Sequence, residues 1–198
     1  SEDSVRRGMK AMDEAASGEW LKGHLKASYE PLLQEPWVFD MDTTVKPLYG
    51  HQQDAKVGYN PTKPGRPSHA YHSYFVAHIR MVLDMEVQAG NQTAPLYAQP
   101  ELWAFLDGLP ERNRPVFLRG DSHWGAEKAM MGAEQRGLGY LFKLKQSANV
   151  KKLIGQIFRK EEWVEAGQQW QGREDVLRLS GWTKARRVVV LRRPLRSQ

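Results

Sequence analysis

The sequence contains no cysteine among its 198 residues. This excludes disulfides, zinc sites with thiolate ligands and a cysteine nucleophile, so oxygen or imidazole ligands must hold any metal ion. Long apolar runs are also missing, and no signal-peptide core follows the charged N-terminal residues. We therefore expect a soluble, cytoplasmic protein that does not contact a membrane.

Acidic residues are fewer than basic ones. With 29 Lys and Arg against 23 Asp and Glu, the net charge is +6 and the pI is about 9.5. This balance is typical of proteins that bind a polyanion, although the positions of the basic residues must decide the matter. The chain begins without methionine and stops in a basic, strand-like segment, so we expect it to be part of a longer protein.

The periodicity of apolar residues predicts three regions. Residues 1–35 form a helical segment of two helices, in which Ser17 is placed to cap the second. Residues 36–158 form the core, a mixed sheet flanked by helices. Residues 159–198 are rich in tryptophan and glycine and predict a small antiparallel sheet.

Within the core, residues 37–42 alternate, which sends Asp40 and Asp42 to one face of a strand. Residues 50–69 are too rich in proline and glycine for regular structure and form a basic loop. Residues 71–79 and 81–88 then predict a hairpin, in which Leu83, Met85 and Val87 share one face and the polar residues between them face solvent.

The second half of the core alternates helix and strand. Pro100 is expected to open a helix that ends before Pro110. A buried strand at 116–118 runs into Asp121, and a helix ending at Gly137 leads to another strand at 140–144. Strand, helix and strand in this order form a parallel crossover unit.

Asp121 follows the carboxyl end of a buried strand, where open α/β sheets place their ligands. The alternative is that Asp121 caps the next helix. Asp40 and Asp42 form a costly pair unless they are exposed or neutralised by a cation; here the alternative is a solvent-facing edge strand. If Asp42 and Asp121 lie on adjacent strands, their carboxylates form a hard oxygen site for Mg²⁺ or Mn²⁺, suited to phosphoryl transfer.

Several long motifs resemble the DDE transposases of bacterial insertion sequences. They are Asp40-Met41-Asp42-Thr43-Thr44 with the residues up to Gln52, Gly58-Tyr59-Asn60-Pro61, Lys63-Pro64-Gly65-Arg66-Pro67-Ser68-His69, Leu118-Arg119-Gly120-Asp121, Tyr140 to Leu144, and Arg186-Arg187-Val188-Val189-Val190. The resemblance therefore covers nearly the whole chain.

The resemblance implies a ribonuclease H-like α/β fold with a β-rich insertion. It assigns Asp42 as the first catalytic metal ligand and Asp121 as the second, with Asp40 as the alternative to Asp42. The third acid of the family is a Glu on a helix after the insertion, which we expect beyond Gln198. None of the glutamates in the insertion is assigned that role: Glu161, Glu162, Glu165 and Glu174.

In the same interpretation, basic residues contact DNA phosphates. The candidates are Lys56, Lys63, Arg66, Arg119, Arg186 and Arg187, with Arg192, Arg193 and Arg196 in the last cluster. Tyr59, Trp170 and Trp182 are candidates for stacking on unpaired bases, although the tryptophans also suit the core of the small sheet. His69, His72 and His78 suit packing or hydrogen bonding, and His123 lies close to Asp121.

The function implied is metal-dependent cleavage and transfer of DNA strands at insertion-sequence ends. Transposon terminal repeats and target DNA are the expected partners, with a possible homodimer of the full-length protein. This chain alone is expected to be inactive because the third acid is missing. The alternatives are a non-catalytic DNA-binding remnant and a stand-alone metal-dependent phosphohydrolase.

Overall fold

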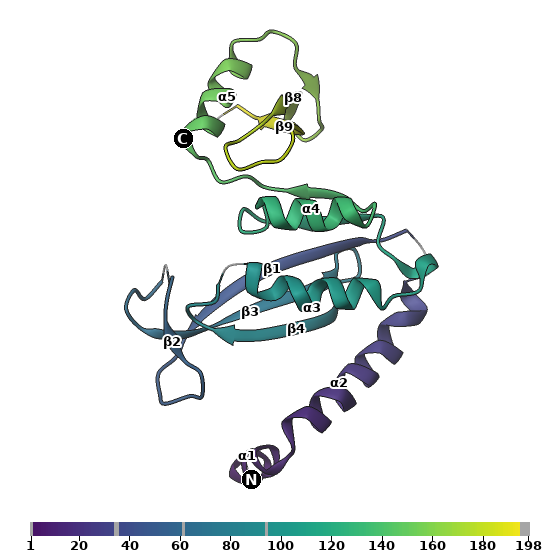
Figure 1. Ribbon diagram of the computed structural model, residues 1–198, viewed down its shortest axis with the longest axis vertical. Coiled ribbons are helices and arrows are strands. Elements are labelled where there is room, and N and C mark those ends of the chain that lie inside the picture. The colour runs from purple at the N-terminus through teal and green to yellow at the C-terminus, as the bar shows by residue number, and fades with distance from the viewer. Residues whose placement is uncertain (1, 34–35, 61, 94, 195–198) are drawn as a thin grey trace.

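The computed structural model describes residues 2–33, 36–60, 62–93 and 95–194 (Figure 1). The helices are α1 (Glu2–Ala11), α2 (Glu14–Tyr29), α3 (Pro95–Asp107), α4 (Glu127–Gln135) and α5 (Ala148–Phe158), with short 3₁₀ turns at Glu30–Leu32 and Glu111–Asn113. The strands are β1 (Val38–Pro47), β2 (Lys56–Val57), β3 (Pro67–Val76), β4 (Met81–Ala89), β5 (Phe117–Gly120), β6 (Gly139–Phe142), β7 (Val164–Glu165), β8 (Gln171–Leu177) and β9 (Arg186–Arg192).

The main sheet is mixed, as the sequence predicts. Strands β3, β1, β5 and β6 are neighbours in that order, and β4 and the short β2 pair with the outer edge of β3. The β1–β3 and β3–β4 pairs are antiparallel, whereas β1–β5 and β5–β6 are parallel. The expected α/β class, a mixed sheet flanked by helices, is confirmed, and β5 ends at Gly120 opposite Met41 in the middle of β1.

One face of this sheet packs against a layer of helices (Figure 1). Phe39 of β1 stacks on Tyr74 of β3 and contacts Phe105 of α3. Leu102 and Leu106 of α3 are buried in the same cluster. Burial of these apolar side chains supplies most of the driving force for folding.

The opposite face is open at Met85, Val87 and Leu141, each more than half exposed. The sequence predicted the same face for Leu83, Met85 and Val87, and this is wrong. The pairing of β3 with β4 shifts after Asp84, which leaves Leu83 as an extra residue in a bulge. A bulge interrupts the alternation, so Leu83 points into the core while Met85 and Val87 face outward.

Two helix boundaries differ from those expected. The cap of α2 is Asp13, whose side chain accepts a hydrogen bond from the amide of Ala16, while the Ser17 hydroxyl bonds back to the carbonyl of Asp13. Helix α3 begins at Pro95, so Pro100 lies inside it. Pro100 is tolerated because it falls in the second turn of α3, close to the end where backbone amides lack helical partners.

The predicted small antiparallel sheet is confirmed as β7–β8–β9. Helix α5 lies beside it (Figure 1). Arg186 at the start of β9 joins this sheet to the core through Glu127 and Glu134 of α4. The exact domain limits stay a prediction. None of the helices described is long and apolar enough to span a membrane.

Candidate active site

Asp42 lies within β1, and Asp121 directly follows the adjacent parallel strand β5. The register of β1 with β5 pairs Asp40 with Arg119 and ends with Met41 opposite Gly120. Asp42 and Asp121 are the next residue of each segment. Parallel neighbours are about 4.8 Å apart, so this register brings the two segments that carry the aspartates close together.

The turn after β5 depends on Gly120. A Cβ at this position would lie 2.8 Å from the Cβ of the buried Trp124, so a larger residue would displace that ring. Asp121 does not cap α4, whose first turn follows Ala126 without a side-chain cap. Instead its Oδ1 accepts the backbone amide of His123 and its Oδ2 lies 3.0 Å from Nδ1 of the same residue. The alternative role of Asp121 as a helix cap is thereby wrong.

Asp40 forms an ion pair with Arg119. Arg119 donates from Nε to Oδ1 and from Nη2 to Oδ2, each at 2.6 Å, and the Asp40 side chain is only 10% exposed. The pair raises the pKa of Arg119 through these hydrogen bonds. A carboxylate held by a bidentate guanidinium is neutralised without a metal ion. Asp42 is half-buried and accepts one bond of 3.2 Å, from the Thr44 hydroxyl.

A fully buried histidine fixes the strand next to Asp42. Nδ1 of His72 lies 2.9 Å from Oγ1 of Thr43, and its Nε2 lies 3.2 Å from the carbonyl of Gln92. Because a carbonyl only accepts, Nε2 carries the proton and Thr43 donates to Nδ1. Burial lowers the pKa of His72, which keeps the ring neutral. The expected hydrogen-bonding role of His72 is confirmed. His69 bonds to the carbonyl of Gln53, and His78 is exposed in a turn.

The donor set suits a hard divalent cation. Asp42 and Asp121 offer only oxygens, and each oxygen that accepts a hydrogen bond retains a further lone pair. Within the described residues, no group of three or more acidic or histidine side chains is arranged to hold a metal ion.

The basic segment is exposed as expected, but it is not free of regular structure, because Lys56 and Val57 form β2 and β3 begins at Pro67. Lys56, Lys63 and Arg66 all face solvent, and the Arg66 guanidinium lies 4.4 Å from the centre of the Tyr49 ring. Lys46 on β1 lies over Tyr71 of β3. Cations held over aromatic rings keep their charge at the surface, so this loop can meet a phosphate backbone.

The arginines in β9 and directly after it differ in their exposure and in their partners. Arg186 is only 6% exposed and binds Glu127 and Glu134 at 2.6 and 2.8 Å, so it is not free to contact DNA. Arg187 is exposed and pairs with Glu174. Arg192 and Arg193 lie over Trp163 and Trp170 at 3.9 and 4.8 Å. Arg196 lies outside the described residues.

The tryptophans of the C-terminal region also differ in burial: Trp182 is buried, whereas Trp163 and Trp170 are half-buried. Trp182 is buried beneath Arg186, which fits a structural role in the small sheet and leaves no ring face open for a base. Trp163 and Trp170 are half-buried, each covered by an arginine.

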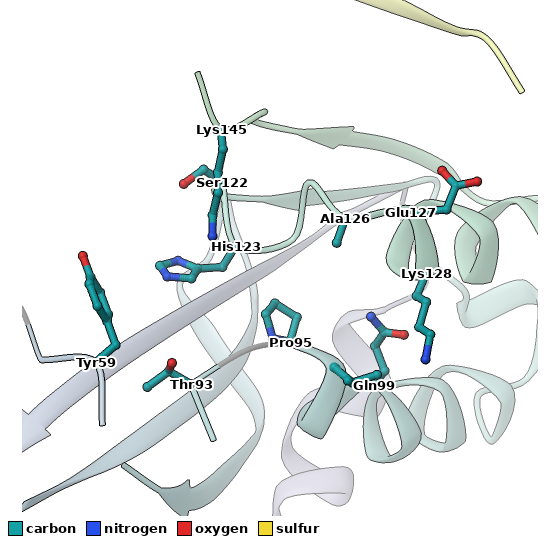
Figure 2. Close-up of a pocket in the computed structure, with 11 residues that line it drawn as sticks. Tyr59, Thr93, Pro95, Gln99, Ser122, His123, Ala126, Glu127, Lys128 and Lys145 are labelled. Atoms are coloured by element: carbon teal, nitrogen blue, oxygen red, sulfur yellow. The ribbon is translucent and has the colours of Figure 1, made fainter. Parts of the chain in front are cut away.

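A cavity of about 670 Å³ opens beside Ser122 and His123, the two residues that follow Asp121 (Figure 2). It is bounded by Tyr59 after β2, by the start of α3 including Pro95 and Gln99, and by Ser122 and His123. Figure 2 shows the amine of Lys145 descending toward His123, with Tyr59 and Gln99 on opposite sides of the space. Its volume lies in the range of small-ligand sites.

Sequence reasoning had singled out Tyr59 and His123 but missed Lys145 and Gln99 in this cavity. Lys145 follows β6, the strand beside β5, so the rule that ligands bind at the carboxyl ends of parallel strands could have identified it. Gln99 gave no such signal, because the helix that carries it begins five residues before the expected Pro100.

Three solved structures resemble this chain at low identity. A chain of the piggyBac transposase synaptic complex with hairpin DNA has a TM-score of 0.48 and 13% identity, covering 91% of this chain and 40% of its own. A chain of the Mos1 strand transfer complex has a TM-score of 0.37 and 11% identity, and the match covers 73% of this chain and 49% of its own. A chain of the simian T-cell lymphotropic virus intasome in complex with the PP2A regulatory subunit B56 gamma has a TM-score of 0.34 and 9% identity. The match covers 62% of this chain and 40% of its own. The chain thus spans less than half the length of each, and these scores carry no functional assignment.

No curated protein matches the sequence significantly. The family model described as "Transposase DDE domain group 1" matches residues 2–194, almost the entire chain. The match includes both strand-end aspartates, the basic loop and the small sheet. The chain therefore belongs to the group 1 transposase DDE domain family.

Proposed function

We propose that this chain is part of the catalytic domain of a transposase that cleaves and joins DNA at the ends of a bacterial insertion sequence. The observation that supports the proposal is the register of β1 with β5, which ends with Met41 opposite Gly120, directly before Asp42 and Asp121. Family membership supports it. The enzyme would act in the bacterial cytoplasm on terminal repeats and target DNA, as a homodimer of the full-length protein.

Asp42 and Asp121 would hold Mg²⁺ or Mn²⁺. When bound there, divalent ions would activate the attacking oxygen and stabilise the leaving oxygen of an in-line phosphoryl transfer. His123 would orient the Asp121 carboxylate through its Nδ1 contact. The hydrogen bond from Thr43 to His72 would fix the end of β1, so that Asp42 keeps its place.

DNA would lie along the basic loop. Lys56, Lys63 and Arg66 are exposed cations, and Arg187 adds one on the small sheet. Arg119 is 53% exposed while it binds Asp40, so it could contact a phosphate with its outer edge. Arg186 is not among the proposed DNA contacts, because it is buried in the junction with α4.

The resemblance to DDE transposases implies a third acidic ligand, a Glu on a helix after the β-rich insertion. Among the described residues, no group of three or more acidic or histidine side chains is arranged to hold a metal ion. Two carboxylates hold an ion loosely, and positioned phosphoryl transfer needs a complete shell. The chain alone would then bind DNA and metal without cleaving.

The second candidate is a DNA-binding remnant without catalysis, favoured by the same incomplete metal shell. Reading the encoding DNA past Gln198 for an in-frame helix that bears Glu separates the two. The protein made from that longer frame should nick terminal-repeat DNA with Mn²⁺, and Asp42→Asn or Asp121→Asn should reduce the rate at least 100-fold. An intact frame whose product binds the repeats but never nicks them would support the remnant.

A further inference from the structure

Helix α1 and the first half of α2 form an arm, residues 2–21, that extends away from the main sheet (Figure 1). Residues 2–16 are all exposed. A helix of 10 residues is marginal by itself in water, and Gly8 in the middle of α1 weakens it further. Such a helix is normally stabilised by packing of an apolar face, so the exposed position of α1 indicates a partner.

One side of α1 is apolar. Val5 and Met9 lie one turn apart, and Met12 follows directly after the helix, with its amide bonded to the carbonyl of Met9. The spacing i, i+4 and i+7 places the three side chains on one stripe. Each of them is more than half exposed, so no element in the described part of the chain covers this stripe.

The apolar stripe of α2 is longer than the surface on which it packs. Tyr29 is buried and Leu25 packs against the core, and Leu21 lies one turn further along the same stripe. Leu21 is nevertheless 52% exposed. The next residue, Lys22, still reaches Asp84 of β4 at 3.9 Å, so α2 leaves the sheet at this level. The arm therefore adds Leu21 to the apolar surface of α1.

The charges of α1 are complementary to those of a second α1 that runs in the opposite direction. The first turn holds Glu2 and Asp3, and Arg6 pairs with Glu2 at 3.2 Å. Arg7 and Lys10 follow toward the other end. An antiparallel pair places the acidic first turn of each helix beside the basic end of the other, whereas a parallel pair brings like charges together. The same surface on two copies can therefore pair with itself, as a two-fold interface requires.

We propose that the arm packs antiparallel against the arm of a second copy of this chain. Val5 of one copy lies against Met9 of the other, and Met12 and Leu21 extend the apolar contact. Two copies held in this way would form the homodimer of the proposed function, on which the role of this surface rests. Self-association needs neither DNA nor metal, so the dimer and the transposase function can fail separately.

Sedimentation equilibrium of the 198-residue chain measures the association. Two short helices bury little surface, so we expect a weak dimer with a dissociation constant in the micromolar range. Met9→Gln should weaken the dimer at least about tenfold, because it makes both copies polar at the centre of the contact. The matched control is Met85→Gln, which replaces an exposed methionine on β4 outside the arm and should leave the affinity within about twofold.

Charge reversal tests the direction of the pairing. One variant carries Glu2→Lys with Asp3→Lys, and the other carries Arg7→Glu with Lys10→Glu. Each variant places like charges at both ends of an antiparallel pair, so each alone should dimerise at least about fivefold more weakly than the parent. An equal mixture of the two brings opposite charges together, and the mixed dimer should regain the parental affinity. Thermal melting of each variant checks its fold.

A chain that stays monomeric at about 100 µM would overturn the proposal. Equal weakening by Met9→Gln and Met85→Gln in folded protein would do the same, and failure of the mixed variants to recover affinity would overturn the antiparallel pairing. Charge variants that lose affinity for duplex DNA while they dimerise like the parent would assign the arm to DNA instead. A full-length protein that forms this dimer but never cleaves terminal repeats would refute the transposase function alone.

Discussion

Arg119 donates two hydrogen bonds of 2.6 Å to Asp40, one to each carboxylate oxygen. The two residues are direct partners in the register of β1 and β5. This ion pair neutralises Asp40, which supports our proposal of Asp42 as the metal ligand of β1. It also ties the strands that carry Asp42 and Asp121.

The first prediction concerns this pair. Arg119→Ala leaves a carboxylate that is 10% exposed without its partner, so the free energy of unfolding should fall by about 1–3 kcal/mol. Urea denaturation measures the change. Mn²⁺ affinity should stay within about twofold, because Asp42 and Asp121 are untouched; a loss of metal binding as large as that of Asp42→Asn would contradict the structural role.

The second prediction compares neighbouring arginines on β9. Arg186→Ala should destabilise the protein by about 2–4 kcal/mol, because it removes the buried cation that Glu127 and Glu134 share at this junction. Arg187→Ala is the matched control: its partner Glu174 is exposed, and the expected loss is below about 1 kcal/mol. Equal losses in the two variants would refute the junction role of Arg186.

The third prediction concerns acid stability. Hydrogen bonding to Arg186 holds the pKa of Glu134 at about 2, against its usual 4.5. A pKa lowered by folding contributes stability above pH 4.5 that is lost as the pH falls toward 2. Unfolding measured across this range should show the loss, and Glu134→Gln should remove part of the pH dependence. An unchanged pH profile in Glu134→Gln would contradict this cause.

The mixed sheet and the strand that leads to Asp121 were predictable from sequence because alternation and strand-end signals are local. The bulge at Leu83 was not predictable, since Leu83, Met85 and Val87 alternate evenly in the sequence while one extra residue reverses the faces within β4. The partner of Asp40 was also hidden, because Arg119 lies 79 residues away and meets it only through the sheet register. The basic motif around Arg186 suggested DNA contacts, yet two glutamates of α4 bury it; charge in a sequence does not specify exposure.

The fourth prediction concerns the basic loop. The chain should bind duplex DNA weakly and with strong salt dependence, since each phosphate contact releases counterions. Replacing Lys56, Lys63 and Arg66 together with glutamine should lower the slope of log affinity against log salt by about 2–3. The control makes the same charge change on α1, at Arg6, Arg7 and Lys10, and should have a smaller effect. Equal effects of the two triple substitutions would show that the loop acts only through the general charge of the chain, which would contradict a contact between the loop and DNA.

The central claim is that Asp42 and Asp121 hold one shared metal ion. Electron paramagnetic resonance titration of Mn²⁺ into the 198-residue chain measures it directly, in the parent, in Asp42→Asn, in Asp121→Asn and in the double variant. Each single substitution should lower the affinity at least about tenfold, and the double variant should lose little more, because removal of either carboxylate dismantles the same site. Undiminished binding in either single variant, or independent losses that add in the double, would contradict the shared site.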